Sequence, residues 1–144
     1  LGRSLVYLYD KLQNLNSEYT LRVSCLELYQ ENVYDLLVDE RERNSLSVRE
    51  HPTDGFFVEG CQIIECPTIK NATKVINKAL RSRQVGSHDY NHRSNRSHFI
   101  LEILLELPGQ HQESNSSQQS LGNDEYTAMG KMTFVDLAGS ERLK

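Results

Sequence analysis

The sequence predicts an α/β domain, because strand-like segments are interleaved with segments of helical periodicity. The clearest strand is 99–107, where apolar residues beginning at Phe99 alternate with a second face that carries two glutamates. The clearest helix is 71–84, in which apolar residues recur every three to four positions. A third signal is the strand-like segment 131–137, which the small residues Ala138-Gly139-Ser140 end. Because strands alternate with helices along the chain, a sheet covered by helices is expected.

The remaining elements follow from the same periodicities. Residues 1–13 have helical spacing and predict the end of an amphipathic helix. Residues 19–28 alternate until Leu26 and Leu28 shift the phase, which predicts a strand buried on both faces in its second half. A helical turn is expected over 33–37. Three short strands are expected between Pro and Gly breaks, at 46–49, 56–59 and 61–65.

The helix at 71–84 has candidate end signals and a basic surface. Asn71 is a candidate N-cap, and Gly86 follows the last turn. From Lys70 to His98 the chain has seven Lys or Arg and one acid. Two interpretations stay open: a solvated helix face, or a surface that faces a polyanion such as phosphate.

Composition limits the class of protein. The chain has 144 residues, a net charge of -4, 38% hydrophobic and 25% charged residues. No apolar run approaches the ~20 residues of a membrane span, and the mild acidity argues against a nucleic-acid partner. Residues 108–129, rich in Gln, Ser, Asn and Gly, predict a flexible insertion loop. Three cysteines without a C-x-x-C pair, Cys25, Cys61 and Cys66, predict reduced thiols in an intracellular protein.

The first stretch with candidate chemistry is 91–98, Asn-His-Arg-Ser-Asn-Arg-Ser-His. It lies between the basic helix and the strand at 99–107, and it contains no apolar residue. Its guanidinium, hydroxyl and amide groups suit phosphate oxygens, or a metal ion and its waters. A plain solvated turn is the alternative.

The second stretch is 134–142, where an apolar strand ends at Asp136 and Gly139 follows. Ligands of open α/β sheets bind beyond the carboxyl ends of strands. An Asp there can hold the water shell of Mg²⁺, and a Gly lets a backbone N–H approach a terminal phosphate closely. Taken alone, the pattern is equally compatible with a strand that ends in a turn.

Together the two stretches resemble the paired switch loops of the kinesin motor domain, whose patterns are N-x-x-S-S-R-S-H and D-L-A-G-S-E. Residues 22–37 resemble that family's V-S-x-x-E-I-Y-N-E-x-V-Y-D-L-L, and residues 57–60 resemble its Y-V-x-G turn. The resemblance implies that 1–144 is the central part of a motor domain with the P-loop NTPase fold, a mixed sheet flanked by helices. The phosphate-binding pattern G-x-x-x-x-G-K-[ST] is not found in these residues.

The resemblance also implies roles for individual residues, with ATP and Mg²⁺ as cofactors. In switch I, Ser94 would position the attacking water. Asn95 stands where the family usually has a second Ser near Mg²⁺, and its amide oxygen can ligate the ion. In switch II, Asp136 would hold Mg²⁺ through water and the Gly139 N–H would sense the γ-phosphate. The remaining site residues implied by resemblance are Asn91, Ser97 and His98, which bind nucleotide, and Arg96 and Glu141, which form a salt bridge between the switches.

The function implied is part of a microtubule-dependent ATPase motor, cytoplasmic and associated with the cytoskeleton. This stretch by itself is not expected to be active, and we expect it to expose apolar strand edges and to fold poorly. Asp54 and Glu59 lie where several kinesins carry basic residues in a microtubule-facing loop, and they should not attract the acidic tubulin surface. A homodimer through segments outside this chain stays open.

Three alternatives remain at this stage. The first is a kinesin-derived binding or regulatory protein with weak or lost ATPase activity, which Asn95, Asp54 and Glu59 favour. The second is a zinc site built from His88, Asp89, His92 and His98. The third is an RNA-binding arm over 93–97, which the acidic net charge opposes.

Overall fold

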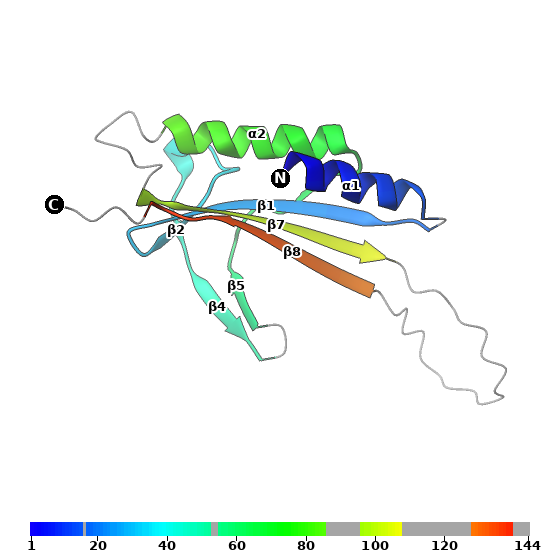
Figure 1. Cartoon of the computed structure of the whole chain (residues 1–144). Coiled ribbons are helices and arrows are strands. Elements are labelled where there is room, and N and C mark those ends of the chain that lie inside the picture. Colours follow the sequence, from blue (N-terminus) through cyan, green and yellow to red (C-terminus); the bar gives the residue numbers. More distant parts are fainter. Residues whose placement is uncertain (16, 53–54, 86–95, 108–127, 140–144) are drawn as a thin grey trace.

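The computed structural model describes residues 1–15, 17–52, 55–85, 96–107 and 128–139. Figure 1 shows a twisted sheet with two helices on one face and a hairpin that projects from the other. The helices are α1 (Gly2–Gln13), the short 3-10 helix η1 (Glu40–Glu42) and α2 (Ile69–Val85). The strands are β1 (Thr20–Tyr29), β2 (Asn32–Asp35), β3 (Ser45–Leu46), β4 (Val48–His51), β5 (Gly55–Val58), β6 (Ile64–Glu65), β7 (His98–Leu107) and β8 (Ala128–Asp136).

The main sheet has the strand order β3-β2-β1-β7-β8, and β6 pairs with β1. The pairings of these strands are antiparallel. In the longest ladders Leu28 faces His98, and Phe99 faces Asp136. The end of β1, the start of β7 and the end of β8 therefore meet at one end of the sheet.

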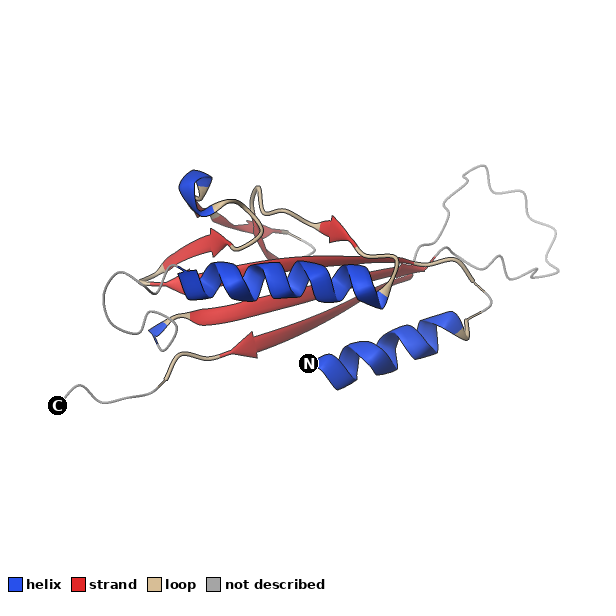
Figure 2. Cartoon of the chain, turned by 90° about the horizontal axis from the view of Figure 1, so that it is seen from above, coloured by secondary structure: helices blue, strands red, loops and turns tan. Residues whose placement is uncertain are grey.

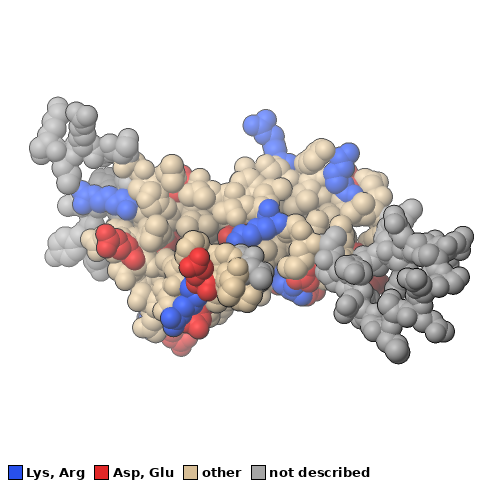
Figure 3. All heavy atoms as spheres, turned by 90° about the horizontal axis from the view of Figure 1, so that it is seen from below, with Lys and Arg blue, Asp and Glu red and all other residues tan. Residues whose placement is uncertain are grey.

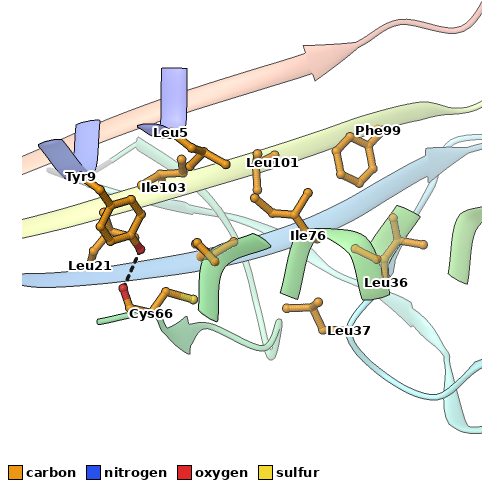
Figure 4. Close-up of a cluster of buried hydrophobic side chains, with 14 of the residues drawn as sticks. Leu5, Tyr9, Leu21, Leu36, Leu37, Cys66, Ile76, Phe99, Leu101 and Ile103 are labelled. Atoms are coloured by element: carbon orange, nitrogen blue, oxygen red, sulfur yellow. Dashed lines mark hydrogen bonds between the residues drawn. The ribbon is translucent and has the colours of Figure 1, made fainter. Parts of the chain in front are cut away.

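The core lies between the helices and the sheet. Both α1 and α2 cover the same face, and α2 lies over the strands and runs roughly along them when seen from above (Figure 2). From α1, Leu5, Tyr9 and Leu12 point inward, which confirms the predicted amphipathic helix. The Tyr9 hydroxyl donates to the carbonyl of Cys66 over 2.6 Å, as Figure 4 shows. This bond ties α1 to the segment that follows β6.

The strand predictions for the centre of the sheet are confirmed. β1 matches the expected 19–28, and it is buried continuously from Val23 to Glu27. β7 matches 99–107, with Phe99, Leu101 and Ile103 on the buried face. β8 begins at Ala128, three residues before the predicted strand. The last two residues of the predicted insertion loop are therefore strand, because they extend the β7–β8 ladder to Leu107, and 108–127 lie outside the described residues.

The predicted helical turn over 33–37 is wrong, because β2 occupies most of it. Gln30 and Glu31 adopt positive φ angles of 49° and 64°, and this two-residue turn folds the chain back onto β1. The alternation then buries Val33 and Asp35. A four-residue strand is too short for its alternation of apolar and polar residues to be distinguished from a helical turn.

The start of α2 also differs from the prediction. The helix begins at Ile69, and the Thr68 hydroxyl accepts the Asn71 N–H over 3.2 Å, so Thr68 takes the capping role expected of Asn71. Gly86 lies outside the described residues. Four short strands lie where three were expected, because the segment expected at 46–49 is divided between β3 and β4. The strand expected at 56–59 is confirmed as β5, and the one expected at 61–65 is reduced to Ile64–Glu65.

The sheet face away from the helices carries charged residues of both signs among apolar ones. Basic and acidic side chains lie interspersed on this side in Figure 3. Three ion pairs account for this pattern: Arg22–Glu106, Lys131–Glu102 at 2.7 Å and Arg49–Glu59 at 3.0 Å. Among the described residues, no helix has the length and apolar character needed to cross a bilayer.

β8 confirms the expected exposure of apolar strand residues. Among the described strands it pairs with β7, and four of the apolar residues on or beside it are largely exposed: Met129, Met132, Val135 and Leu137. That the chain folds poorly by itself stays a prediction.

Candidate functional site

The described parts of the two stretches singled out in the sequence, 96–98 and 134–139, lie side by side at one end of the sheet. β7 begins at His98 and β8 ends at Asp136, and these strands are neighbours. The structure therefore brings together five predicted site residues: Arg96, Ser97, His98, Asp136 and Gly139. The other four, Asn91, Ser94, Asn95 and Glu141, lie outside the described residues.

Arg83, in the last turn of α2, joins the two stretches. Its Nε donates to the Ser97 hydroxyl over 3.3 Å, and one terminal nitrogen donates to the Ser97 carbonyl over 2.8 Å. The other terminal nitrogen donates to Asp136 Oδ2 over 2.8 Å. The planar fork of a guanidinium allows these directions at once, which an ammonium group could not match.

The three residues of this arrangement differ in how far they are buried. Arg83 is 8% exposed and Ser97 is 0% exposed, whereas the Asp136 side chain is 69% exposed. A buried guanidinium needs acceptors for its N–H groups, and Ser97 and Asp136 supply three of them. Because Asp136 is mostly open to solvent, its carboxylate retains lone pairs for a water molecule or a cation.

His98 provides a second link between the stretches. Its Nδ1 accepts the backbone N–H of Ala138 over 3.0 Å. An accepting Nδ1 carries no proton, so the neutral ring holds its proton on Nε2. This bond fixes the first residues after β8 against the first residue of β7, one residue before the exposed Gly139.

In this arrangement Ser97 and His98 make structural hydrogen bonds within the protein. The Ser97 hydroxyl is buried against Arg83, and the acceptor nitrogen of His98 is occupied by Ala138. Their direct contact with a nucleotide stays a prediction. Arg96 is exposed at the same end of the sheet, where it is accessible to a partner.

The sequence contained a signal for Arg83 that its basic surroundings obscured. Arg83 lies seven positions after Ile76 and four after Ala79, both of which are buried on the inner face of α2. Helical periodicity therefore places it on the apolar stripe, unlike exposed Lys70 and Lys74. A charged residue on a buried stripe needs a partner, and this is the observation that could have identified it.

One described side chain of this site is a suitable ligand for Mg²⁺. The Asp136 carboxylate is a hard oxygen ligand, exposed and next to a turn that carries Gly139. Among the described residues there is no cluster of three His, Cys, Asp or Glu that could hold a metal. Of the four residues in the zinc hypothesis only His98 is described, so that hypothesis is not supported by any contact here.

An apolar groove of about 570 Å³ lies elsewhere, between α1 and the start of α2. Its lining includes Val6 and Tyr7 from α1 and Thr73 from α2. Arg83 stands near the other end of α2, so the groove is separate from the site at the sheet end.

Comparison with known proteins agrees with this geometry. The family model described as kinesin motor domain matches residues 1–144. The chain is 37% identical to "Kinesin-like protein KIF12" of Mus musculus, over 99% of this chain and 21% of that protein. It is 35% identical to "Kinesin-related protein 7" of Dictyostelium discoideum, over 92% of this chain and 10% of that protein.

A solved structure of a fast kinesin has the same fold. It aligns with a TM-score of 0.82 and 28% identity, over 99% of this chain and 37% of that one. The chain therefore spans about a fifth or less of these two curated relatives and about a third of the solved kinesin chain. The α/β fold class and the resemblance to the kinesin motor domain are confirmed. The chain belongs to the kinesin motor-domain family.

Proposed function

We propose that this chain is part of a microtubule-dependent ATPase motor, in which ATP hydrolysis with Mg²⁺ is coupled to microtubule binding and movement. The single observation that carries the proposal is the joining of the two switch stretches by Arg83, through Ser97 on one side and Asp136 on the other. Loops that must respond together to a nucleotide need such a mechanical connection.

The described residues suit this chemistry. When bound, Mg-ATP supplies the phosphoryl group and a cation that offsets its charge. Asp136 would hold a water of the Mg²⁺ shell with the oxygen that Arg83 leaves available. Gly139 has no side chain, so its N–H can approach a terminal phosphate closely. Kinesin relatives and the solved fast kinesin support this assignment by family.

The residues outside the described part complete the proposal. Ser94 would position the attacking water, and the Asn95 amide oxygen would ligate Mg²⁺ where the family usually has a hydroxyl. Arg96 and Glu141 would form a salt bridge that connects the two loops when they close. We place the protein in the cytoplasm, on the microtubule cytoskeleton.

ATPase measurements on the full-length gene product test this function. We expect turnover that depends on Mg²⁺ and rises when microtubules are added. Asp136→Asn serves as the inactive variant, because an amide holds a Mg²⁺ water less well than a carboxylate. Turnover with microtubules that does not exceed that of Asp136→Asn would refute the motor.

A second candidate is a kinesin-derived binding or regulatory protein with weak or lost ATPase activity. The observation that favours it is the Arg49–Glu59 ion pair at 3.0 Å, which pairs the arginine of the β4–β5 hairpin with an acid. Because Glu50 and Asp54 leave the hairpin with an excess of acids, it gains little from the acidic tubulin surface. Sedimentation with microtubules, measured beside turnover, distinguishes the two: binding without turnover supports the second candidate.

A further inference from the structure

Phe99 occupies the centre of a row of side chains beneath the end of α2. In the register of the sheet, Glu27 on β1 faces Phe99 on β7, and Phe99 faces Asp136 on β8. Residues that face one another on antiparallel strands project to the same side of the sheet. Phe99 is 4% exposed and belongs to the core covered by the helices (Figure 4). The ring therefore stands between two carboxylate-bearing positions.

The Arg83 guanidinium lies over this ring. Its central carbon is 5.8 Å from the ring centroid, within the range of a cation–π contact. The same guanidinium donates to Ser97 and to Asp136. The guanidinium thus contacts an aromatic ring and also donates hydrogen bonds to acceptors from the two switch stretches.

We propose that Phe99 is a positioning residue: its ring holds the Arg83 guanidinium between Ser97 and Asp136, and so keeps the two switch stretches aligned for turnover. The part that concerns turnover rests on the proposed function. An arginine side chain loses about 2 kcal/mol of rotamer freedom when it is fixed. A flat ring that attracts the cation restricts the side chain to the plane in which both acceptors are reached.

The competing explanation is that Phe99 only fills the core. Both explanations predict that a smaller residue destabilises the protein, so stability alone cannot decide. A double-mutant cycle can, because it measures whether Phe99 and Arg83 act through each other. Phe134 is a matched control: it packs against the same core and lies two residues before Asp136. Of these two rings, Phe99 is the one found under Arg83 among the described residues.

The first experiment reads the local structure by hydrogen exchange in the full-length gene product. The readout is the exchange rate of backbone amides in 96–99 and 136–139, which include the Ala138 N–H bonded to His98. We expect Phe99→Leu to speed this exchange about fivefold more in the Arg83 protein than in the Arg83→Met background. For Phe134→Leu we expect equal effects in both backgrounds. A fivefold factor corresponds to about 1 kcal/mol, the usual size of a cation–π contact.

The second experiment reads the reaction. We expect Phe99→Leu to lower kcat about fivefold while KM for ATP changes less than about twofold, since the ring is buried and would act through Arg83 on the alignment of the switch stretches. Phe99→Tyr keeps a ring face and should recover most of kcat. Phe134→Leu should leave kcat unchanged.

The two experiments distinguish failure of the positioning role from failure of the proposed function. Equal effects of Phe99→Leu in both Arg83 backgrounds would overturn the positioning role, whatever the turnover result. A wild-type protein without turnover would overturn the proposed function, and the exchange cycle would still decide the role of Phe99. If Phe99→Leu does not fold, Phe99→Met, which keeps more of the core volume without a ring, is compared in the same two Arg83 backgrounds: a larger effect in the Arg83 protein supports the proposal, and equal effects overturn it.

Discussion

Arg83 and Asp136 form an ion pair of 2.8 Å across 53 positions of sequence, between the last turn of α2 and the last residue of β8. The pair is asymmetric, because the guanidinium is buried and the carboxylate is mostly exposed. The exposed end is screened by water, so the carboxylate contributes less than a fully buried partner would. The bonds to Ser97, inside the protein, therefore account for most of what this arginine stabilises.

Arg83→Lys should test this division of roles. A lysine keeps the charge near Asp136, but its single nitrogen cannot reproduce the forked geometry by which three Arg83 nitrogens reach two oxygens of Ser97 and one of Asp136. We expect the loss of the buried bonds to cost about 1–3 kcal/mol in the free energy of unfolding. Arg81→Lys, on the exposed side of the same helix, is the control and should change it by less than ~0.5 kcal/mol. Equal losses for the two variants would contradict the role assigned to Arg83.

Glu141→Ala should separate nucleotide binding from coupling. If Arg96 and Glu141 connect the switches, the variant loses a contact made only when the loops close. We expect microtubule-stimulated turnover to fall at least about tenfold while the affinity for ATP changes little, as when an interaction specific to the transition state is removed. Stopped-flow binding of a fluorescent ATP analogue, beside steady-state turnover, measures both. Unchanged turnover would remove Glu141 from the site.

The sequence predicts best those elements that are long enough to repeat their hydrophobic pattern several times. β1, β7 and α2 each repeat their pattern over ten residues or more, so periodicity identifies them without knowledge of tertiary contacts. β2 has four residues, and its alternation depends on a turn whose residues are poor turn formers. In the site, the motifs indicate Asp136 directly. The motifs do not include Arg83, because its partners Ser97 and Asp136 are distant in sequence and come near α2 only in the folded chain.

The β1–β2 turn should be improvable. Gln30 and Glu31 have positive φ angles of 49° and 64°, a region that costs a long side chain free energy and that Asn and Gly tolerate. We expect Gln30→Asn to raise the free energy of unfolding by about 0.5 kcal/mol. Gln13→Asn in α1 is the control, since there Asn lowers helix propensity and should destabilise slightly. A loss of stability in Gln30→Asn would contradict the positive-φ turn.

Asp35 should be the most sensitive acid outside the site. It is 2% exposed, its Oδ1 accepts the Leu37 N–H over 2.8 Å, and its Oδ2 accepts the Gln62 N–H over 2.6 Å. Asp35→Asn replaces one acceptor with an NH₂ group that faces a backbone donor. We expect a loss of about 2–3 kcal/mol in chemical denaturation. The exposed Asp39, which accepts the Arg41 N–H over 3.2 Å, is the control, and Asp39→Asn should cost under ~1 kcal/mol. Similar losses at both positions would show that the Asp35 bonds add nothing.

Cys25 should make the protein sensitive to alkaline pH. Burial, and the negative charge of nearby Asp35, raise the pKa of the Cys25 thiol from its ordinary 9.0 to about 12. Below pH 9 the thiol is protonated in both states and stability is unaffected. Between pH 9 and 12 the unfolded chain releases the proton while the folded chain keeps it, so unfolding becomes easier as pH rises.

The comparison of wild type with Cys25→Ala isolates this effect, because the alanine cannot ionise. We expect wild type to be the more stable at pH 7 by a margin that is constant up to about pH 9. By pH 10.5 the margin should shrink by about 2 kcal/mol, at 1.36 kcal/mol for each pH unit above the unfolded pKa. Val23→Ala, at a buried position of the same strand, creates a cavity without a titrating group, so its cost should not vary with pH. A Cys25→Ala margin that stays as constant as that of Val23→Ala would show that the buried thiol has an ordinary pKa.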